Sequence, residues 1–266
     1  MPLNKYRYYL YSIWELLTGV QPWLPVSRAF IMGQPPSGFI IRLRQSGLKF
    51  KVRTLMDIWT VKETFLDRFY ERYGTVIGNG WSVIDIGGGI GDFTIFVAAK
   101  HPNNVVYTFE PNPESVALME ANLQLNRLSN VKVYPEAVWS SGGEVLLDTT
   151  SSEPGGYASK NLDATYDPTQ KPLIIASLSL QDVFDRTGLA HCNLLKIDCE
   201  GAEFPILLEA QAQVFDRIER IIMEYHETVT GNNHQILVEF LMRQGYAVKT
   251  YPNAVHEHLG YIYAAR

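Results

Sequence analysis

The segment Asp85-Ile86-Gly87-Gly88-Gly89-Ile90-Gly91 has the clearest capacity for chemistry in this chain. Glycine has no Cβ, so a glycine cluster lets the backbone turn sharply and lets a ligand approach it closely. A helix that begins at the end of such a turn presents unpaired N–H groups and the positive end of its dipole, which suit a carboxylate. Asp85, just before the turn, could face a cationic part of the same ligand. The segment predicts a binding loop between a strand and a helix.

Glu110 lies nineteen residues after Gly91, at the predicted end of the next strand. An acid at this place can accept hydrogen bonds from both hydroxyls of a ribose, and nicotinamide-binding enzymes share this spacing. The glycine loop of the nicotinamide-binding enzymes has the pattern G-x-G-x-x-G or an alanine variant. This chain does not fit that pattern, because its last position is Asp92 when counted from Gly87 and Thr94 when counted from Gly89. The pattern G-x-x-x-x-G-K-[ST] of the loop that binds nucleoside triphosphates is absent too. An acid two residues before G-x-G-x-G is the arrangement used for S-adenosylmethionine, so we predict that cofactor, with S-adenosylhomocysteine as its product.

Two further motifs follow the glycine turn: Phe109-Glu110-Pro111-Asn112-Pro113 and Leu195-Lys196-Ile197-Asp198-Cys199-Glu200-Gly201-Ala202-Glu203. With the turn, they resemble the FkbM-type methyltransferases, in that family's order, over a stretch from about Phe50 to the C-terminus. The last motif is the most specific, because it is not a general feature of Rossmann-like folds. The family commonly has Gly-Ala-Asn-Ile-Gly at the turn, so Gly89 removes one polar contact and moves the loop toward the general methyltransferase pattern.

The resemblance implies nine cofactor-binding residues: Asp85, Gly87, Gly89, Gly91, Glu110, Asn112, Glu136, Ala137 and Asp198. It implies that Asp85 and the glycines hold the methionine end and that Glu110 binds the ribose. Asn112 would lie beside the adenosine, and Glu136 and Ala137 would flank the adenine. These places agree with the general rule that open α/β sheets bind ligands at the carboxyl ends of their strands, near the switch in strand order.

By the same resemblance, Asp198 would face the amino group of the cofactor and the mouth of the substrate site. If the acceptor is an alcohol, its proton must leave during methyl transfer, so a base or a metal would help. The candidate catalytic residues are His226, Asp198 and Glu200. His226 has the unperturbed pKa that best suits a base, although a surface or capping role fits it equally. A divalent cation bound by Asp198, Glu200 and Glu224 is an alternative, but a metal is not expected.

Strands and helices alternate from Trp81 onward, which predicts a mostly parallel sheet with helices on both faces. We expect an α/β fold with a doubly wound, Rossmann-like, seven-stranded methyltransferase sheet. The predicted strands are 83–86, 105–109, 131–134, 145–147, 194–198, 218–224, 246–251 and 259–264, and the predicted helices are 92–100, 113–126, 203–212 and 233–243. Residues 140–172 hold Ser, Gly, Asp and Pro clusters and are expected to form a mobile loop.

Residues 1–75 are expected to form an N-terminal helical and hairpin segment, ahead of a cofactor-binding domain over 76–266. An amphipathic helix is predicted in the first twenty residues. A hairpin joins Phe39–Leu43 to Leu48–Val52, and a helix over Val61–Tyr73 follows. This aromatic-rich segment could cover the substrate pocket, form a homodimer surface, lie on a membrane or simply pack on the main domain.

The composition limits the classes of partner. Hydrophobic residues make up 46% of the chain, and the formal net charge is −5. Most Lys and Arg residues are scattered, so nucleic acid is not an expected partner. Cys192 and Cys199 are too few for a disulfide scaffold or a zinc site. With no run of eighteen apolar residues and no signal-peptide pattern, no stable membrane insertion and a cytoplasmic location are expected.

These features predict an S-adenosylmethionine-dependent methyltransferase that acts on an oxygen of a small molecule. The resemblance implies a sugar, glycan or secondary-metabolite acceptor. Methylation of carbon or nitrogen is the alternative, because such acceptors can need less help from a base. An NAD-type oxidoreductase is a weaker alternative, which the spacing of the glycine loop disfavours.

Overall fold

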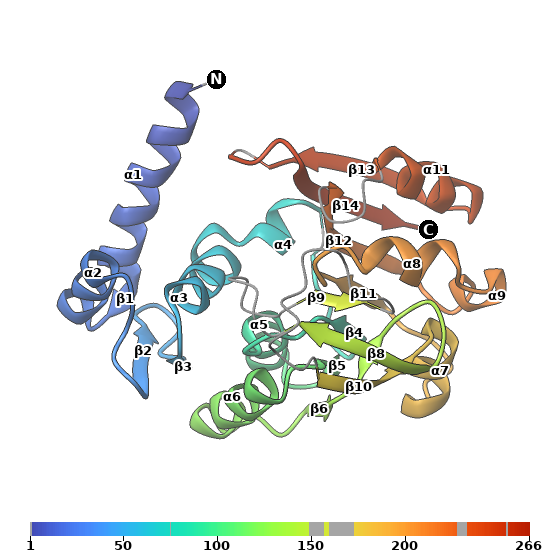
Figure 1. The fold of residues 1–266 in the computed structure, drawn as a ribbon, viewed down its shortest axis with the longest axis horizontal. Helices are drawn as coiled ribbons and strands as arrows, with labels where there is room; N and C mark the ends of the chain where they lie inside the picture. Colours follow the sequence, from blue (N-terminus) through green and yellow to red (C-terminus); the bar gives the residue numbers. More distant parts are fainter. Residues whose placement is uncertain (1, 75, 149–156, 160–172, 228–232, 254) are drawn as a thin grey trace.

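The computed structural model describes residues 2–74, 76–148, 157–159, 173–227, 233–253 and 255–266. Its centre is a seven-stranded sheet with the strand order β13-β14-β12-β11-β4-β5-β6 (Figure 1). The strands are β4 (Ser82–Ile86), β5 (Val105–Phe109), β6 (Val131–Tyr134), β11 (Leu194–Ile197), β12 (Arg220–His226), β13 (Ala247–Pro252) and β14 (Leu259–Ala265). The seven-stranded Rossmann-like sheet predicted from the sequence is confirmed.

Within this sheet, β14 runs against its neighbours. β6, β5, β4, β11 and β12 pair in parallel, whereas β14 pairs antiparallel with both β12 and β13. Among the described strands, β13 joins the sheet only through β14, although β13 comes earlier in the chain. The chain proceeds from β4 to β5 and β6 on one side and then returns to β11 on the other. The switch in strand order therefore lies between β4 and β11, where sheets of this type bind their ligands.

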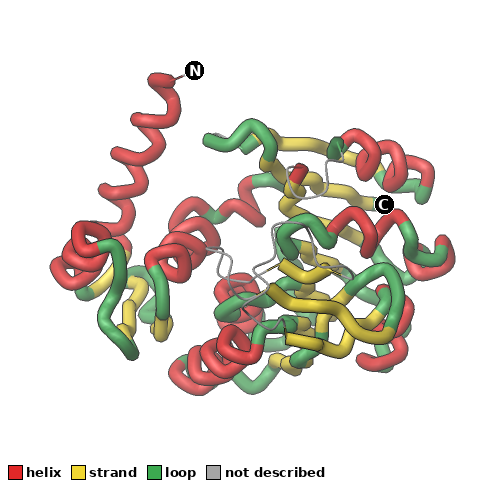
Figure 2. The backbone as a smooth tube through the Cα atoms, viewed as in Figure 1, coloured by secondary structure: helices red, strands yellow, loops and turns green. Residues whose placement is uncertain are grey.

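Helices cover both faces of the sheet (Figure 2). They are α5 (Asp92–Lys100), α6 (Pro113–Leu125), α7 (Leu180–Thr187), α8 (Glu203–Leu208), α9 (Ala212–Phe215) and α11 (Gln235–Arg243). Successive side chains of a strand point to opposite faces. In β4, Ile84 accordingly packs in one buried cluster with Phe204 of α8, and Val83 packs in another with Phe93 of α5.

Local signals mark where two of these helices begin. Asn112 caps α6, because its side chain accepts hydrogen bonds from two backbone N–H groups of the first turn, and Pro113 occupies the first helical position. Ser179 and Asp182 form a capping box at the start of α7. Helix α6 was predicted from the sequence, whereas α7 was overlooked.

A second, four-stranded sheet lies between β6 and α7 in the chain, with the order β7-β10-β8-β9. Its strands are β7 (Ala137–Val138), β8 (Gly143–Asp148), β9 (Tyr157–Ser159) and β10 (Leu173–Leu178). The predicted strand over 145–147 is confirmed by β8. Outside that predicted strand, the prediction of a mobile loop is wrong for 143–144, 148 and 157–159, because these residues also pair as strands. Residues 149–156 and 160–172 lie outside the described residues.

The N-terminal segment comprises α1 (Pro2–Gly19), β1 (Val20–Gln21), α2 (Trp23–Met32), β2 (Phe39–Leu43), β3 (Lys49–Val52), α3 (Leu55–Lys62), a π-helical turn (Glu63–Asp67) and α4 (Phe69–Arg72). The predicted first helix and hairpin are confirmed. The single helix over Val61–Tyr73 is wrong. A capping box of Thr54 and Asp57 starts α3 earlier, and Arg68, with φ 54°, interrupts the helix before α4. Helix α2 was overlooked. Its Pro25 lies in the first turn, where proline is tolerated.

The N-terminal segment shares a hydrophobic cluster with the helices of the main sheet. Ile41 of β2 and Phe50 of β3 belong to the same buried cluster as Ile95 of α5 and Leu123 of α6. The backbone N–H of Lys51 also donates to Asn122 Oδ1 of α6 at 2.7 Å. Helix α1, in contrast, extends away from the rest of the molecule (Figure 1). The hairpin is therefore anchored to the main domain, while much of α1 is exposed.

Candidate active site

A pocket of about 430 Å³ lies at the carboxyl ends of the central strands. Its volume is within the range of small-molecule sites. Residues at or just after the ends of β4, β5, β11 and β12 line it, among them Gly87, Glu110, Asp198, Glu224 and His226. The N-terminal segment supplies another part of the wall, including Trp59, Thr60, Thr64 and Tyr70. The pocket is thus at the switch point where the sequence predicted the ligand.

The glycine turn combines close packing with open space. A Cβ on Gly87, whose φ is 78°, would lie 1.8 Å from the carbonyl oxygen of Asp198, so the turn packs directly against the end of β11. A Cβ on Gly88 would lie 2.2 Å from Thr108 Oγ1. Gly89, with φ 51°, differs because no described atom lies within 4 Å of its Cβ position, and this residue lines the pocket. Gly89 therefore leaves room for a ligand beside the backbone.

Asp85 is fully buried, and its carboxylate is held by other side chains. Lys196 Nζ lies 3.1 Å from Asp85 Oδ1, and Thr94 Oγ1 donates to Asp85 Oδ2 at 2.6 Å. Lys196 also donates to the carbonyl oxygen of Gly87 at 2.7 Å. The cation that Asp85 meets is therefore Lys196, and Asp85 is not one of the residues that line the pocket. The pair connects β4, β11 and the glycine turn.

Glu110 lines the pocket and is only 3% exposed. Its Oε2 accepts the backbone N–H of Gly89 at 2.8 Å, and its Oε1 accepts that of Asn112 at 2.9 Å. Burial raises the pKa of Glu110 to about 7, against the opposing effect of these two donors. Each carboxylate oxygen has a further lone pair, so Glu110 can accept additional hydroxyl groups.

Several residues that the resemblance implies for the cofactor have other surroundings. Gly91 is the residue before α5, and Asn112 caps α6. Glu136 Oε2 lies 3.3 Å from Arg186 Nε, and Ala137 is buried at the start of β7. The structure thus brings four of the nine predicted residues to the pocket wall: Gly87, Glu110, Gly89 and Asp198. The other five, with Asp85 among them, lie outside the lining.

His226, the predicted base, has both ring nitrogens next to carboxylates. Its Nδ1 lies 2.9 Å from Glu203 Oε1, and its Nε2 lies 3.5 Å from Glu200 Oε2. Burial alone lowers the pKa of His226, but the hydrogen bond and charge of Glu203, with the charges of Glu200 and Asp198, raise it to about 11. The side chain is therefore an imidazolium at neutral pH, which argues against the predicted role as a base.

Asp198 and Glu200, the other predicted catalytic residues, both line the pocket. Tyr70 donates its hydroxyl to Asp198 Oδ2 at 3.2 Å, and Lys196 Nζ lies 3.8 Å from the same oxygen. The side chains of Asp198 and Glu200 are 25% and 27% exposed. Both carboxylates are therefore accessible to a ligand in the pocket, unlike that of Asp85.

Carboxylates outnumber basic side chains on the pocket wall. Seven Asp and Glu residues line it, against three basic side chains that are charged at neutral pH, those of Arg53, Lys196 and His226. Burial raises the pKa of Glu63 to about 8 and that of Asp92 to about 6. The pKa of Glu224 is also raised well above its ordinary value, by burial first and then by the charge of Asp198. A ligand that carries positive charge would lower these raised pKa values, so its binding to the pocket is favoured.

One group of side chains in the described part of the chain has the spacing of a cation site. Asp198, Glu224 and His226 each offer one ligand atom, and these atoms lie within 4.8 Å of one another. The alternative raised by the sequence had Glu200 in place of His226. A histidine must be deprotonated to bind a metal, whereas His226 already faces Glu200 and Glu203 with its two nitrogens. Its present contacts thus compete with metal binding.

Three residues of the site were overlooked in the sequence. Lys196 had a signal, because a lysine inside the apolar run of β11 must find a buried partner. Glu203 was named only as the last residue of the third motif, but it is fully buried and bonds to His226. Tyr70 carried no signal, since its contact with Asp198 joins positions far apart in the chain.

The sheet order, the glycine turn after the first central strand and the acid after the second define the class of Rossmann-like methyltransferases. The family described as "Methyltransferase FkbM domain" matches residues 85–255, which is more than half of the chain. The chain belongs to the FkbM methyltransferase family. The resemblance noted in the sequence is confirmed.

The relatives include bacterial and fungal methyltransferases. The chain is 30% identical over 191 residues to the "31-O-demethyl-FK506 methyltransferase FkbM" of Streptomyces tacrolimicus, a match that covers 62% of this chain and 73% of the relative. It is 25% identical over 178 residues to "Methyltransferase 1" of Beauveria bassiana, covering 61% and 71%. The crystal structure of methyltransferase FkbM from Methylobacillus flagellatus aligns with a TM-score of 0.49 and 13% identity, over 79% of this chain and 54% of that one.

Proposed function

We propose that this protein uses S-adenosylmethionine to methylate an oxygen atom of a small molecule. The observation that carries the proposal is the acid-rich pocket at the switch point, in which Glu110 and the open side of Gly89 lie next to each other. Family membership supports methyl transfer, and the excess of carboxylates supports a cationic cofactor.

The residues of the pocket fit this cofactor in three respects. Glu110 has free lone pairs at the end of β5 for the ribose hydroxyls. Gly89 has no described atom within 4 Å of its Cβ position, so the backbone there is accessible. Asp198 is the accessible carboxylate for the amino group, and the positive end of α5 suits the carboxylate.

When bound, S-adenosylmethionine supplies a methyl group on a sulfonium sulfur and leaves as S-adenosylhomocysteine. The chain's own task is mainly to hold the acceptor in line with that group, which can contribute roughly 7–11 kcal/mol at best. Trp59, Thr60 and Tyr70 of the N-terminal segment form the part of the wall that can orient an acceptor.

The acceptor hydroxyl must also lose a proton, and Asp198 and Glu200 are the accessible acceptors for it. His226, which carries a proton itself, lies between Glu200 and Glu203 and keeps the Glu200 carboxylate in place. Asp198 is oriented by Tyr70 and Lys196. In this proposal His226 and Tyr70 are positioning residues, and the two carboxylates accept the proton.

Oxygen is preferred over carbon or nitrogen for two reasons. Carboxylates in the pocket provide the base that a hydroxyl acceptor needs. The 30% identical relative also has a name that gives a 31-O-demethyl compound as its substrate. A hydroxyl of a sugar, a glycan or a secondary metabolite is the acceptor class that we propose, with carbon or nitrogen methylation as the alternative.

Isothermal titration of the protein with S-adenosylmethionine and S-adenosylhomocysteine tests the proposal, with mass spectrometry of labelled methyl transfer to a panel of hydroxyl compounds. Glu110→Ala should weaken cofactor binding roughly ten- to hundredfold, as expected for the loss of hydrogen bonds to a charged group. Glu120→Ala, on the exposed face of α6, is the matched control. No heat with the parent protein, or a response to NADH instead, would refute the proposal.

A further inference from the structure

The N-terminal part of the chain has the opposite charge from the remainder. Residues 1–53 contain eight Lys or Arg and one Glu, a net charge of +7. The whole chain has 23 basic and 28 acidic residues, so residues 54–266 contain 15 and 27, a net charge of −12. Such an asymmetry within one chain indicates that its basic end meets an anionic partner.

The same part of the chain exposes most of the large apolar side chains that reach solvent. Of the eighteen exposed large hydrophobic residues described, eleven lie between Tyr9 and Ile40. In α1, Leu10, Ile13 and Trp14 are 68%, 54% and 63% exposed and lie at i, i+3 and i+4, so they form one stripe along the helix. The buried Ser12 and Leu16 face the other way. No described part of the chain covers this stripe.

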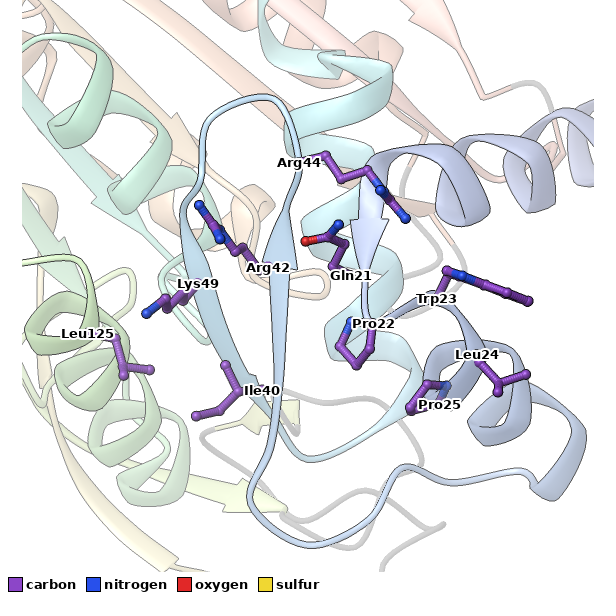
Figure 3. Close-up of a pocket in the computed structure, with 10 residues that line it drawn as sticks. All are labelled: Gln21, Pro22, Trp23, Leu24, Pro25, Ile40, Arg42, Arg44, Lys49 and Leu125. Atoms are coloured by element: carbon purple, nitrogen blue, oxygen red, sulfur yellow. The ribbon is translucent and has the colours of Figure 1, made fainter.

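Helix α2 and the β2–β3 hairpin bring the basic and apolar groups together. Trp23 and Leu24 line a surface groove of about 650 Å³ with Arg42, Arg44 and Lys49. Figure 3 shows the hairpin side chains and the first residues of α2 around this groove. Arg42, Arg44 and Lys49 are exposed and form no salt bridge with a described carboxylate. Their charges are therefore available to a partner.

We propose that α1, α2 and the outer face of the β2–β3 hairpin, the N-terminal surface, bind the headgroup region of an anionic phospholipid bilayer. Amphipathic helices with tryptophan on the apolar side and arginine or lysine nearby lie in the plane of such interfaces. Each basic side chain close to an anionic leaflet strengthens binding about fivefold. The binding is peripheral, since no helix in the described part of the chain is long and apolar enough to cross a bilayer.

The positive charge of the N-terminal surface favours a bilayer over a second copy of the chain as its partner. A symmetric dimer through the N-terminal surface, which carries seven Lys or Arg and one Glu, would place two segments of net charge +6 against each other, which is unfavourable. An anionic leaflet complements the same charge and also takes up the aliphatic side chains. Nucleic acid would complement the charge but offers no apolar phase for Leu10, Ile13 and Ile31.

Co-sedimentation of the full chain with vesicles tests the proposal. We expect binding to vesicles that contain phosphatidylserine, little binding to phosphatidylcholine alone, and release by high salt. Arg42→Glu/Arg44→Glu should reduce binding by about tenfold or more. Trp14→Ser/Trp23→Ser should reduce it several-fold without changing the salt dependence.

Arg243→Glu/Lys249→Glu is the control, because it alters the net charge by the same amount at exposed positions of α11 and β13, far from α1 and α2 (Figure 1). This variant should bind like the parent, and all variants should have the parent's thermal unfolding midpoint. The proposal is overturned if the parent does not bind anionic vesicles, or if the control loses as much binding as Arg42→Glu/Arg44→Glu. A stable dimer that is broken by Trp14→Ser/Trp23→Ser, without vesicle binding, would assign the surface to a second copy instead.

Discussion

Lys196 Nζ lies 3.1 Å from Asp85 Oδ1, and both side chains are almost completely buried. Burial alone would lower the pKa of Lys196, but the carboxylates of Asp85, Asp198 and Asp92 raise it, so the lysine stays charged. Because Lys196 also holds the carbonyl oxygen of Gly87, this pair positions the glycine turn from the neighbouring strand. The pair thus connects the most specific motif of the sequence with the glycine turn that we propose as the cofactor-binding loop.

Replacing Lys196 by Met should destabilise the protein by about 3–5 kcal/mol, because it leaves the Asp85 carboxylate buried without a counter-ion. Urea unfolding followed by circular dichroism measures the change. The double variant Asp85→Asn/Lys196→Met should recover part of the loss, since it removes the unpaired charge. Lys249→Met, at an exposed position of β13, should stay within about 0.5 kcal/mol of the parent. A Lys196→Met protein as stable as the parent would refute the role given to the pair.

The affinity for the cofactor should rise with pH through the pKa of Glu110. That pKa is raised from 4.5 to about 7, so the proton leaves within the neutral range and adds a negative charge to a pocket for a cation. Titration calorimetry at about pH 6 and about pH 8 should show tighter binding at the higher value. Glu110→Gln should reduce this difference by the share that belongs to Glu110, while Glu63, with a pKa of about 8, and Asp92, with a pKa of about 6, keep theirs. If the cofactor affinity of the parent and of Glu110→Gln depended equally on pH, the titration of Glu110 would not be linked to cofactor binding.

The same shift makes a prediction for the stability of the protein without its cofactor. The folded state binds the Glu110 proton more tightly than the unfolded state, so the contribution of Glu110 to the free energy of unfolding is highest below about pH 4.5 and declines as pH rises toward 7. The contribution is on the order of 3 kcal/mol. Urea unfolding of the parent and of Glu110→Gln over this range measures it as the difference between the two pH dependences.

Two glycines of the turn should respond differently to substitution. Gly87→Ala should destabilise the protein by about 2 kcal/mol or more, since the new Cβ would meet the backbone oxygen of Asp198. Gly89→Asn should fold like the parent and still bind the cofactor, because asparagine tolerates positive φ and the space beside Gly89 is open. Thermal unfolding and cofactor titration of both variants provide the check. Similar losses in both would show that Gly89 is also closely packed.

Chelation should leave methyl transfer unchanged, and added Mn²⁺ should not stimulate it. The reason is that His226 already uses both ring nitrogens in contacts with Glu200 and Glu203. An assay after treatment with EDTA, with and without Mn²⁺, tests this expectation. If activity is lost and then restored by Mn²⁺, and Glu224→Gln prevents the restoration, the group of Asp198, Glu224 and His226 is a metal site.

The main sheet could be predicted because its signals are local. Apolar strands, a proline at the start of α6 and a glycine turn all act within a few residues, and the observed bounds of α5 and β5 coincide with the predicted ones. The four-stranded sheet was harder, since β8 pairs with β10 across a long interval of sequence. Helix α2 was also overlooked, although Pro25 lies in its first turn, where proline costs no hydrogen bond.

The position of the site in the fold could be predicted from the sequence, but the contacts that set the charge states of its side chains could be predicted only in part. Glu110 and Asp198 follow strand ends, and parallel strands bring such residues to one edge of the sheet. The partners that set their properties come from elsewhere, as with Tyr70 on Asp198 and Glu203 on His226. An isolated histidine has a pKa near neutrality, but a buried carboxylate at 2.9 Å reverses the expected charge state. Distances of this kind cannot be obtained from spacing along the chain.

The order of strands at one edge of the main sheet has a consequence for synthesis on the ribosome. β13 emerges before β14 but has no pairing strand until β14 inserts between it and β12. Until then, β12 presents an open hydrogen-bonding edge, and the nascent chain carries a hydrophobic strand to which another chain can add. β14 therefore closes this edge of the sheet, and a chain that lacks it would leave the hydrogen-bonding edge of β12 open.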